Sequence, residues 1–493
     1  MVVVEASKLK LPNPSHSSFP PRVTSLLFES HSRSLALMHS DSSLSLYPFI
    51  SPLSISSLPS PQTLVPAPSS SSTFLLLRDH DPCANPNTTN PRTLFVVSGP
   101  YRGGSQVLLR FYVLLQKSKS FARARVVCNQ RGLRFDDKLG VLVDVNHGVS
   151  VRLSGSVNFF ALYSVSSSKI LVFAVRTVGD DGGGDDGVVV KLMRCSVIQC
   201  FRPVFSISVF FGSLVLGEES GVRVFNLRSL VKGRVREVMN PNLHRSSING
   251  MLNEKSDARG FHLPNGVITD DYTKYRGGRT EDERATQVTW NGYLDGRMDK
   301  HYVSVKPSSI KVRQDSSEGV ACFVAFGGYE VGSSTSSRTL QMSVKAISIQ
   351  AFSSKKFVVL DSAGDLHLLF LSSSVVGSDN SCHMKQLPHF MKVQKLAILP
   401  DVSIRTQTVW ISDGCYSVHM MAASEPDTSV DKNDRNKSQE ELMQISVSDA
   451  IFTSEKIEDV IPLAPNAVLI LGEGLSLSLG IESHLAKFSV NTL

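Results

Sequence analysis

The chain has 493 residues, of which 41% are hydrophobic and 19% charged, and its formal net charge is +7. The composition is that of a globular protein able to bury a large core, and the charge supports solubility as well as it supports nucleic-acid binding. No apolar run approaches the ~20 residues that a membrane-spanning helix needs, and the valines before Glu5 are too few for a signal-peptide core. We expect no membrane association and a place in the cytoplasm or nucleus, without an organellar transit peptide.

The cysteines are odd in number and scattered, with no C-x-x-C pair. A disulfide framework or a structural zinc site would show a denser and more regular spacing. We therefore expect reduced thiols in an intracellular protein. The seven residues are Cys83, Cys128, Cys195, Cys200, Cys322, Cys382 and Cys415.

Taken in chain order, short apolar runs joined by turn residues recur up to residue 227. Four such units occupy residues 22–49, 93–115, 159–175 and 188–227. Each reads as an apolar strand, a turn and a second apolar strand. Residues 140–153 predict an additional hairpin, which turns at the sequence Asn-His-Gly.

The pattern stops at residue 228, and the chain is then polar as far as residue 319, with many Asn, Arg, Asp and Gly residues. Such a segment cannot bury enough apolar surface to offset the entropy lost on ordering. We predict three regions: the first part of a strand-rich fold over 1–227, a polar, largely disordered insertion over 228–319, and the second part of the fold over 320–493.

Residues 345–371 show the repeating unit most clearly. Residues 347–351 alternate between apolar and polar, as a half-buried strand does, and residues 357–360 form the continuous apolar run of a strand covered on both faces. The five residues that follow, Asp-Ser-Ala-Gly-Asp, predict a hairpin turn in which Gly364 adopts a positive φ. Gly414 is expected to serve a second turn in the same way.

The apolar runs before the turns align as seven units, spaced mostly 50–66 residues apart. Repeated antiparallel meanders without intervening helices favour an all-β fold, a β-propeller of about seven blades, with room for an eighth unit beside the insertion. Two stacked β-sandwich domains are the alternative. The units align on Met38, Val97, Tyr163, Leu216, Leu360, Ile411 and Leu471.

Three segments carry a family resemblance: VVLDSAGDLHLLF, LVLGEESGVRVFNL and VWISDGCYSVHMM. On these segments the chain resembles the WD-repeat-like β-propellers, and the resemblance covers most of the chain outside the insertion. The Trp-Asp dipeptide is absent, because Trp290 precedes Asn291 and Trp410 precedes Ile411. The resemblance implies a rigid platform whose loops and top face bind other macromolecules.

No motif of a nucleotide-binding loop, a hydrolase elbow or a zinc helix occurs in the sequence. Asp361 and Asp365 could form a catalytic carboxylate pair with His367 nearby, but turn chemistry explains carboxylates at these positions more simply. We predict a protein that is not an enzyme, with no cofactor and no metal site.

Residues 117–134 are basic and contain an aromatic residue among the cations. Lysine and arginine could contact phosphates while a phenylalanine stacks on a base. An exposed loop with solvated charges is the alternative. The candidate nucleic-acid contacts are Lys117, Lys119, Phe121, Arg123, Arg125, Arg131 and Arg134.

These observations favour a non-enzymatic scaffold or adaptor that binds other proteins. The alternative is a propeller subunit of a nuclear complex that binds RNA or DNA through the basic stretch. The scaffold interpretation rests on analogy with other proteins of the same fold, and the nucleic-acid interpretation rests on the positive charge of residues 117–134. The oligomeric state is not indicated by any pattern in the sequence.

Overall fold

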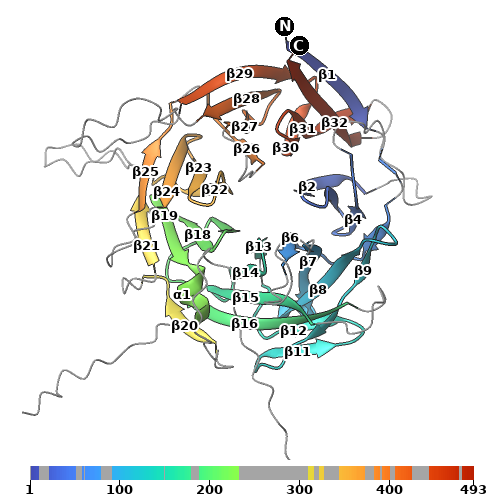
Figure 1. Cartoon of the computed structure of the whole chain (residues 1–493), viewed down its shortest axis with the longest axis vertical. Helices are drawn as coiled ribbons and strands as arrows, with labels where there is room; N and C mark the ends of the chain where they lie inside the picture. Colours follow the sequence, from blue (N-terminus) through green and yellow to red (C-terminus); the bar gives the residue numbers. More distant parts are fainter. Residues whose placement is uncertain are drawn as a thin grey trace, which may run out of the picture.

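The computed structural model forms a closed ring of β-sheets, with both termini on the same side of the ring (Figure 1). The described part of the chain forms seven sheets, so the β-propeller prediction is confirmed, with seven blades. The residues that the structure describes are 2–9, 21–51, 58–59, 61–78, 91–148, 150–178, 188–232, 309–315, 321–326, 343–371, 382–388, 391–399, 406–424, 444–476 and 480–492.

Each blade has four main strands, called first to fourth from the centre of the ring to its rim. Blade 1 consists of β2 (Val23–Glu29), β3 (Ser34–His39), β4 (Leu44–Tyr47) and β5 (Thr63–Val65). Blade 2 consists of β6 (Ser71–Leu77), β7 (Arg92–Tyr101), β8 (Gln106–Leu115) and β12 (Gly140–Val143), followed on the outside by β11 (Leu133–Asp136). The short strand β9 (Ser120–Arg123) also pairs with β8, and a 3-10 turn at Arg102–Gly104 joins β7 to β8. Blade 3 consists of β13 (Val151–Gly155), β14 (Phe159–Ser164), β15 (Lys169–Val178) and β16 (Val189–Gln199), with β10 (Arg125–Val127) and β20 (Ile310–Arg313) on its edge.

The remaining four blades have four strands each. Blade 4 consists of β17 (Ser206–Phe210), β18 (Ser213–Glu218), β19 (Gly221–Asn226) and β21 (Ala321–Ala325), and the helix α1 (Leu227–Lys232) follows β19. Blade 5 consists of β22 (Ala346–Ala351), β23 (Lys356–Asp361), β24 (Leu366–Leu371) and β25 (Cys382–Gln386). Blade 6 consists of β26 (Lys395–Ile398), β27 (Thr406–Ser412), β28 (Ser417–Ser424) and β29 (Gln444–Phe452). Blade 7 consists of β30 (Lys456–Ala464), β31 (Ala467–Ser476), β32 (Gly480–Thr492) and β1 (Val2–Leu9).

Blade 7 joins the two ends of the chain. The N-terminal strand β1 pairs antiparallel with the C-terminal strand β32, from Val2 opposite Thr492 to Leu9 opposite Leu485. The ring is therefore closed by backbone hydrogen bonds between segments at opposite ends of the sequence.

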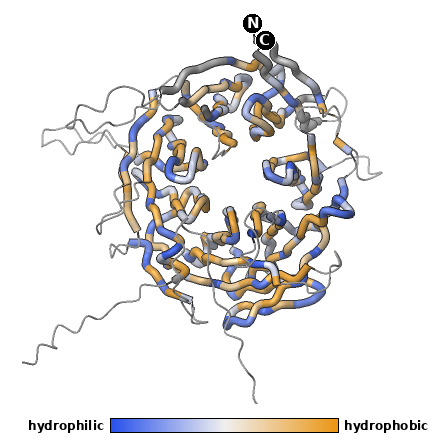
Figure 2. Tube along the Cα trace, in the orientation of Figure 1, coloured by the Kyte–Doolittle hydropathy of each residue, from blue (hydrophilic) through white to orange (hydrophobic). Residues whose placement is uncertain are grey.

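Hydrophobic residues recur along the strands of the blades (Figure 2), and their side chains form the core as clusters between neighbouring blades. In β14, Phe160 and Leu162 pack toward blade 2, whereas Phe159, Ala161 and Tyr163 pack toward blade 4. A strand buried on both faces needs a continuous apolar run, which is what the sequence shows at the second strand of each unit. Each large apolar side chain fully buried in this way contributes roughly 1.5–3 kcal/mol.

Polar side chains on the first strands tie neighbouring blades together around the centre of the ring. The backbone amide of Leu153 donates to Ser71 Oγ at 2.9 Å, and that of Val209 donates to Ser154 Oγ at 2.9 Å. The Gln350 side chain forms two such bonds: its Nε2 donates to the carbonyl of Leu396, and its Oε1 accepts from the amide of Ile398. These bonds satisfy backbone groups that the sheets leave unpaired at the inner edges.

The hairpin predicted over residues 140–153 was wrong. Residues 140–143 form β12 of blade 2, and residues 151–155 form β13 of blade 3, so the Asn-His-Gly sequence lies in a connection between blades. Turn residues mark a reversal of the chain, but they do not show whether the two flanking strands pair with each other.

The predicted insertion contains ordered elements at both of its described ends. Asn226 Oδ1 accepts from the backbone amide of Arg228 at 2.8 Å and caps α1, whose Leu230 and Val231 are buried between blades 3 and 4. At the other end, β20 pairs with β16. The prediction of disorder for the rest of 228–319 lies outside the described residues.

Candidate interaction surface

One face of the ring is built from short, hydrogen-bonded turns. Antiparallel strands place the turns between second and third strands on the same face as the connections from one blade to the next; we call it the turn face. Where these second-to-third turns are described they are short, and they cover residues 40–43, 102–105, 165–168, 219–220, 362–365 and 413–416.

The predicted turn at Asp361 is confirmed in detail. Asp361 Oδ1 accepts from the amides of Ala363 at 2.8 Å and Asp365 at 2.9 Å, and Oδ2 accepts from His367 Nε2 at 2.8 Å. Gly364 has a φ of 87°. Burial by itself would raise the pKa of Asp361, but the hydrogen bonds from His367 and the backbone amides lower it below its usual value of 3.8. The carboxylate is occupied in holding the turn and is not free to act on a substrate.

Other blades have a buried polar residue at or near the end of the second strand. In blade 6, for example, Ser412 Oγ accepts from the amide of Gly414, whose φ is 72° as predicted for this turn. The turns of blades 5 and 6 are therefore fixed by side chains at the ends of their second strands. The residues at these positions are His39, Ser98, Ser164, Glu218, Asp361 and Ser412.

The basic stretch is divided between two blades. Residues 120–123 pair with β8 in blade 2, residues 125–127 pair in parallel with β16 in blade 3, and residues 133–136 return to blade 2. The six candidate cations are exposed along this rim, at Lys117, Lys119, Arg123, Arg125, Arg131 and Arg134.

Phe121 does not lie with these cations on the surface. It is 4% exposed and packs between blades 1 and 2, with its ring centroid 6.3 Å from that of Phe74 and 6.5 Å from that of Phe95. Its ring is covered, so stacking on a base is not available to it in this arrangement.

The outer edge of blade 3 is covered along its length. The strand β10 pairs with residues 189–191 of β16, and β20 pairs with residues 196–199. Between these two strands, the side-chain amide of Gln130 bonds the backbone of Arg194 as a paired strand would. Its Oε1 accepts from the Arg194 amide at 2.6 Å, and its Nε2 donates to the Arg194 carbonyl at 3.1 Å. The edge of this sheet is thus occupied by segments from blade 2 and from the end of the connection that follows α1.

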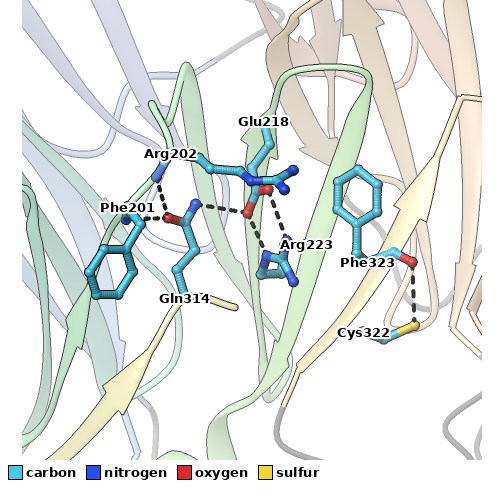
Figure 3. A network of polar contacts seen from close by, with 7 residues as sticks. All are labelled: Phe201, Arg202, Glu218, Arg223, Gln314, Cys322 and Phe323. Carbon is cyan, nitrogen blue, oxygen red and sulfur yellow. Dashed lines mark hydrogen bonds and ion pairs between the residues drawn. The ribbon is translucent and has the colours of Figure 1, made fainter. Parts of the chain in front are cut away.

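A buried polar network fixes that connection where it returns (Figure 3). Glu218 is 0% exposed and pairs with Arg223, whose Nε and Nη2 donate to its two carboxylate oxygens at 2.6 Å and 3.1 Å. Gln314 donates to Glu218 Oε1 at 2.8 Å and accepts from the amides of Phe201 and Arg202. Gln314 therefore joins residues 201 and 202, which follow β16 of blade 3, to the Glu218 carboxylate of blade 4.

Blade 6 is different, because it presents two aromatic side chains to solvent, one in the turn before β28 and one at the end of its outer strand β29. Tyr416 is 55% exposed and Phe452 is 76% exposed. Their backbones are neighbours, because the amide of Thr453 donates to the Tyr416 carbonyl at 2.8 Å and Ser417 is opposite Phe452 in the sheet. We call Tyr416 and Phe452 the aromatic pair.

The aromatic pair is held on a rigid frame. Asp413 Oδ1 accepts from the amides of Cys415 at 2.8 Å and Ser417 at 3.2 Å and so fixes the turn that carries Tyr416. His419 makes an edge contact with the Phe452 ring at 6.4 Å. Large aromatic side chains that are already ordered lose little entropy on binding and are common anchors of protein interfaces.

The sequence did not indicate the aromatic pair or the glutamine bridges. Tyr416 follows a predicted turn, but Phe452 is 36 positions away and only the pairing of β28 with β29 brings it close. In the part of the chain that the structure describes, no group of three or more His, Cys, Asp and Glu side chains is placed to hold a metal ion. Nor does any described helix have the length and apolarity to cross a membrane.

Comparison with known proteins gives structural similarity only. No protein-family model matches the chain, and no curated protein matches it in sequence. Among solved structures, the Cps50 (Swd1) β-propeller domain of Myceliophteria thermophila aligns at 7% identity, covering 96% of this chain and 98% of that one, with a TM-score of 0.42. The WD40 repeats of RRP9 align at 7% identity (99% and 97%, TM-score 0.37) and the WD40 domain of SCAP from fission yeast at 8% (99% and 98%, TM-score 0.34). The fold assignment therefore stands on the sheet topology of this chain itself.

Proposed function

We propose that this β-propeller is a non-enzymatic scaffold that binds a protein partner at the rim of blade 6, through the aromatic pair. The observation that carries the proposal is the exposure of Tyr416 and Phe452, 55% and 76%, on neighbouring backbone segments of a hydrogen-bonded frame. Leaving two large aromatic groups in water costs free energy that burial against a partner would recover, at about 25 cal/mol per Å² of apolar surface.

The position of the aromatic pair also supports a protein partner. Phe452 ends the fourth strand of blade 6, and Tyr416 lies in a turn of the turn face, so both residues are reachable from the rim and from that face. The closed ring keeps them in place, since the sheet of blade 6 packs against blades 5 and 7. The described cysteines are free thiols, which fits a reducing compartment such as the cytoplasm or nucleus.

Affinity purification with variants tests the proposal. The tagged full-length chain and the double variant Tyr416→Ser/Phe452→Ser are isolated from cells, and co-purifying proteins are quantified by mass spectrometry. We expect at least one partner to fall by about tenfold or more in the double variant, as loss of an interface anchor implies.

A matched control is Leu64→Ser. Leu64 lies on β5, the fourth strand of blade 1, and is 55% exposed, like Tyr416. The control should retain every partner. Retention of all partners by the double variant, or their equal loss in the control, would contradict the assignment of binding to blade 6.

Nucleic-acid binding through the basic rim of blades 2 and 3 rests on charge alone, because Phe121 is buried. Reversing the charge at Lys119, Arg123, Arg125 and Arg131 should therefore leave the protein partners unchanged. We expect weak binding of single-stranded RNA at physiological salt. In a tight complex, the logarithm of the affinity would instead fall with the logarithm of the salt concentration, with a slope of roughly −0.7 per phosphate contact. Loss of such a complex in the charge-reversed variant would favour the nucleic-acid function.

A further inference from the structure

Two cysteines meet across the boundary between blades 4 and 5. Cys322 lies on β21 and Cys382 on β25, the fourth strands of their blades, which follow one another along the rim (Figure 1). The thiol groups of the two residues lie close enough to interact, and both side chains pack against the hydrophobic cluster between the two blades. Among the described cysteines, these two face one boundary from two different blades.

The surroundings leave this pair accessible from one side. Both residues are partly exposed, and both pack against the hydrophobic cluster between blades 4 and 5. In contrast, Cys195 and Cys200 are each 5% exposed and lie inside the cluster between blades 3 and 4. A small oxidant can therefore reach Cys322 and Cys382 from the rim without unfolding a blade.

We propose that Cys322 and Cys382 form a reversible disulfide that cross-links the rims of blades 4 and 5 when glutathione disulfide is the oxidant. Two thiols that face the same cluster from neighbouring strands need little movement to reach the sulfur–sulfur bond length.

The oxidation takes two thiol–disulfide exchange steps. Burial, followed by the contact with Cys322, raises the pKa of Cys382 to about 12. In the first step of the proposed sequence, the Cys322 thiolate displaces one glutathione thiolate from glutathione disulfide and forms a mixed disulfide. Cys382 then gives up its proton and attacks the Cys322 sulfur, which expels the second glutathione. The two protein thiols lose two electrons in total, and glutathione disulfide is reduced to two glutathione thiols.

Mass spectrometry of the unreduced full-length protein tests this assignment. The protein is equilibrated with mixtures of reduced and oxidised glutathione, remaining thiols are alkylated, and the peptides are identified. We expect a cross-linked peptide joining Cys322 to Cys382 that accumulates with oxidised glutathione and disappears with dithiothreitol. Its formation should raise the melting temperature by roughly 2–5 °C, because the bond closes a long loop in the unfolded chain.

Single variants separate this pair from incidental oxidation. Cys382→Ser should trap glutathione on Cys322, and Cys322→Ser should abolish the cross-link while leaving Cys382 largely unmodified. Cys128→Ser is the matched control, since Cys128 is also partly exposed but lies at the edge of blade 3, and the cross-link should survive it. Absence of the cross-linked peptide from folded wild-type protein in excess glutathione disulfide, or pairing of Cys322 with another cysteine, would overturn the proposal.

Discussion

The outer edges of blades 3 and 6 show two different uses of the rim. The edge of blade 3 is covered by β10, Gln130 and β20, and each of these comes from a distant part of the sequence. The edge of blade 6 ends at β29, and the last residue of that strand, Phe452, is 76% exposed.

From this difference we expect substitutions at the edge of blade 3 to affect stability and substitutions of the aromatic pair in blade 6 to affect binding. At blade 3, polar side chains satisfy backbone groups and one another, so their removal leaves buried donors and acceptors without partners. At blade 6, the aromatic pair has solvent on its outer side, so its removal costs the folded chain little. The predictions below follow this contrast from the largest expected effect to the smallest.

Glu218→Ala should cause the largest loss of stability. It leaves Arg223, which is 9% exposed, without its bidentate partner, and breaking a buried ion pair in this way costs about 3–5 kcal/mol. Urea unfolding measures the change. The double variant Glu218→Leu/Arg223→Met should lose less than Glu218→Ala alone, because no buried charge is left unpaired. A loss below about 1 kcal/mol for Glu218→Ala would show that the network is not a tie between blades 3 and 4.

Gln314→Ala should have the next largest effect. The amides of Phe201 and Arg202 lose their acceptor, and Glu218 loses a donor, which should cost about 1–3 kcal/mol in urea unfolding. The matched control is Lys311→Ala, because Lys311 lies on the same returning segment and its side chain is exposed. Equal midpoints for Gln314→Ala and wild type would contradict the role given to this glutamine.

Asp361→Asn should have a smaller effect that depends on pH. The pKa of Asp361 in the folded protein is below the usual 3.8, so the ionised carboxylate stabilises the fold above that value, and this contribution is lost as the pH falls through the lower, folded pKa. The stability difference between wild type and Asp361→Asn should shrink as the pH falls from about 4 through the lower, folded pKa. Asp413→Asn, at the corresponding turn of blade 6, provides the comparison without a buried histidine partner. A difference that grows on acidification would contradict the sign of the pKa shift.

Tyr416→Ser/Phe452→Ser should have the smallest effect on stability. Surface substitutions away from buried contacts usually change the free energy of unfolding by no more than about 0.5 kcal/mol. The urea midpoint should therefore match that of wild type. A loss of more than about 2 kcal/mol would mean that the aromatic pair belongs to the core of blade 6 and is not a binding surface.

The sequence predicted the features that are local in the chain. All seven alignment positions lie in second strands of blades, from Met38 in β3 to Leu471 in β31, because the run of apolar residues and the following turn are adjacent in sequence. The positive φ values of Gly364 and Gly414 follow from the same local pattern. Seven sheets in the described residues support the propeller over two stacked sandwiches.

The features that the sequence missed depend on pairing between distant segments. The parallel pairs of β16 with β10 and with β20 have no hairpin signal, so the basic stretch was treated as one surface and the segment around residue 310 as part of a disordered insertion. Phe121 illustrates the same limit: a phenylalanine between cations has the same local sequence whether its ring stacks on a base or, as here, packs between blades.

The dissociation constant of a partner identified by co-purification tests the central claim most directly. It should be measured by calorimetry for purified wild type and for Tyr416→Ser/Phe452→Ser, with Leu64→Ser as the control. The account predicts a dissociation constant at least about tenfold higher for the double variant, at an unchanged urea midpoint, and no change for the control. Equal dissociation constants for wild type and the double variant would contradict the assignment of partner binding to the rim of blade 6.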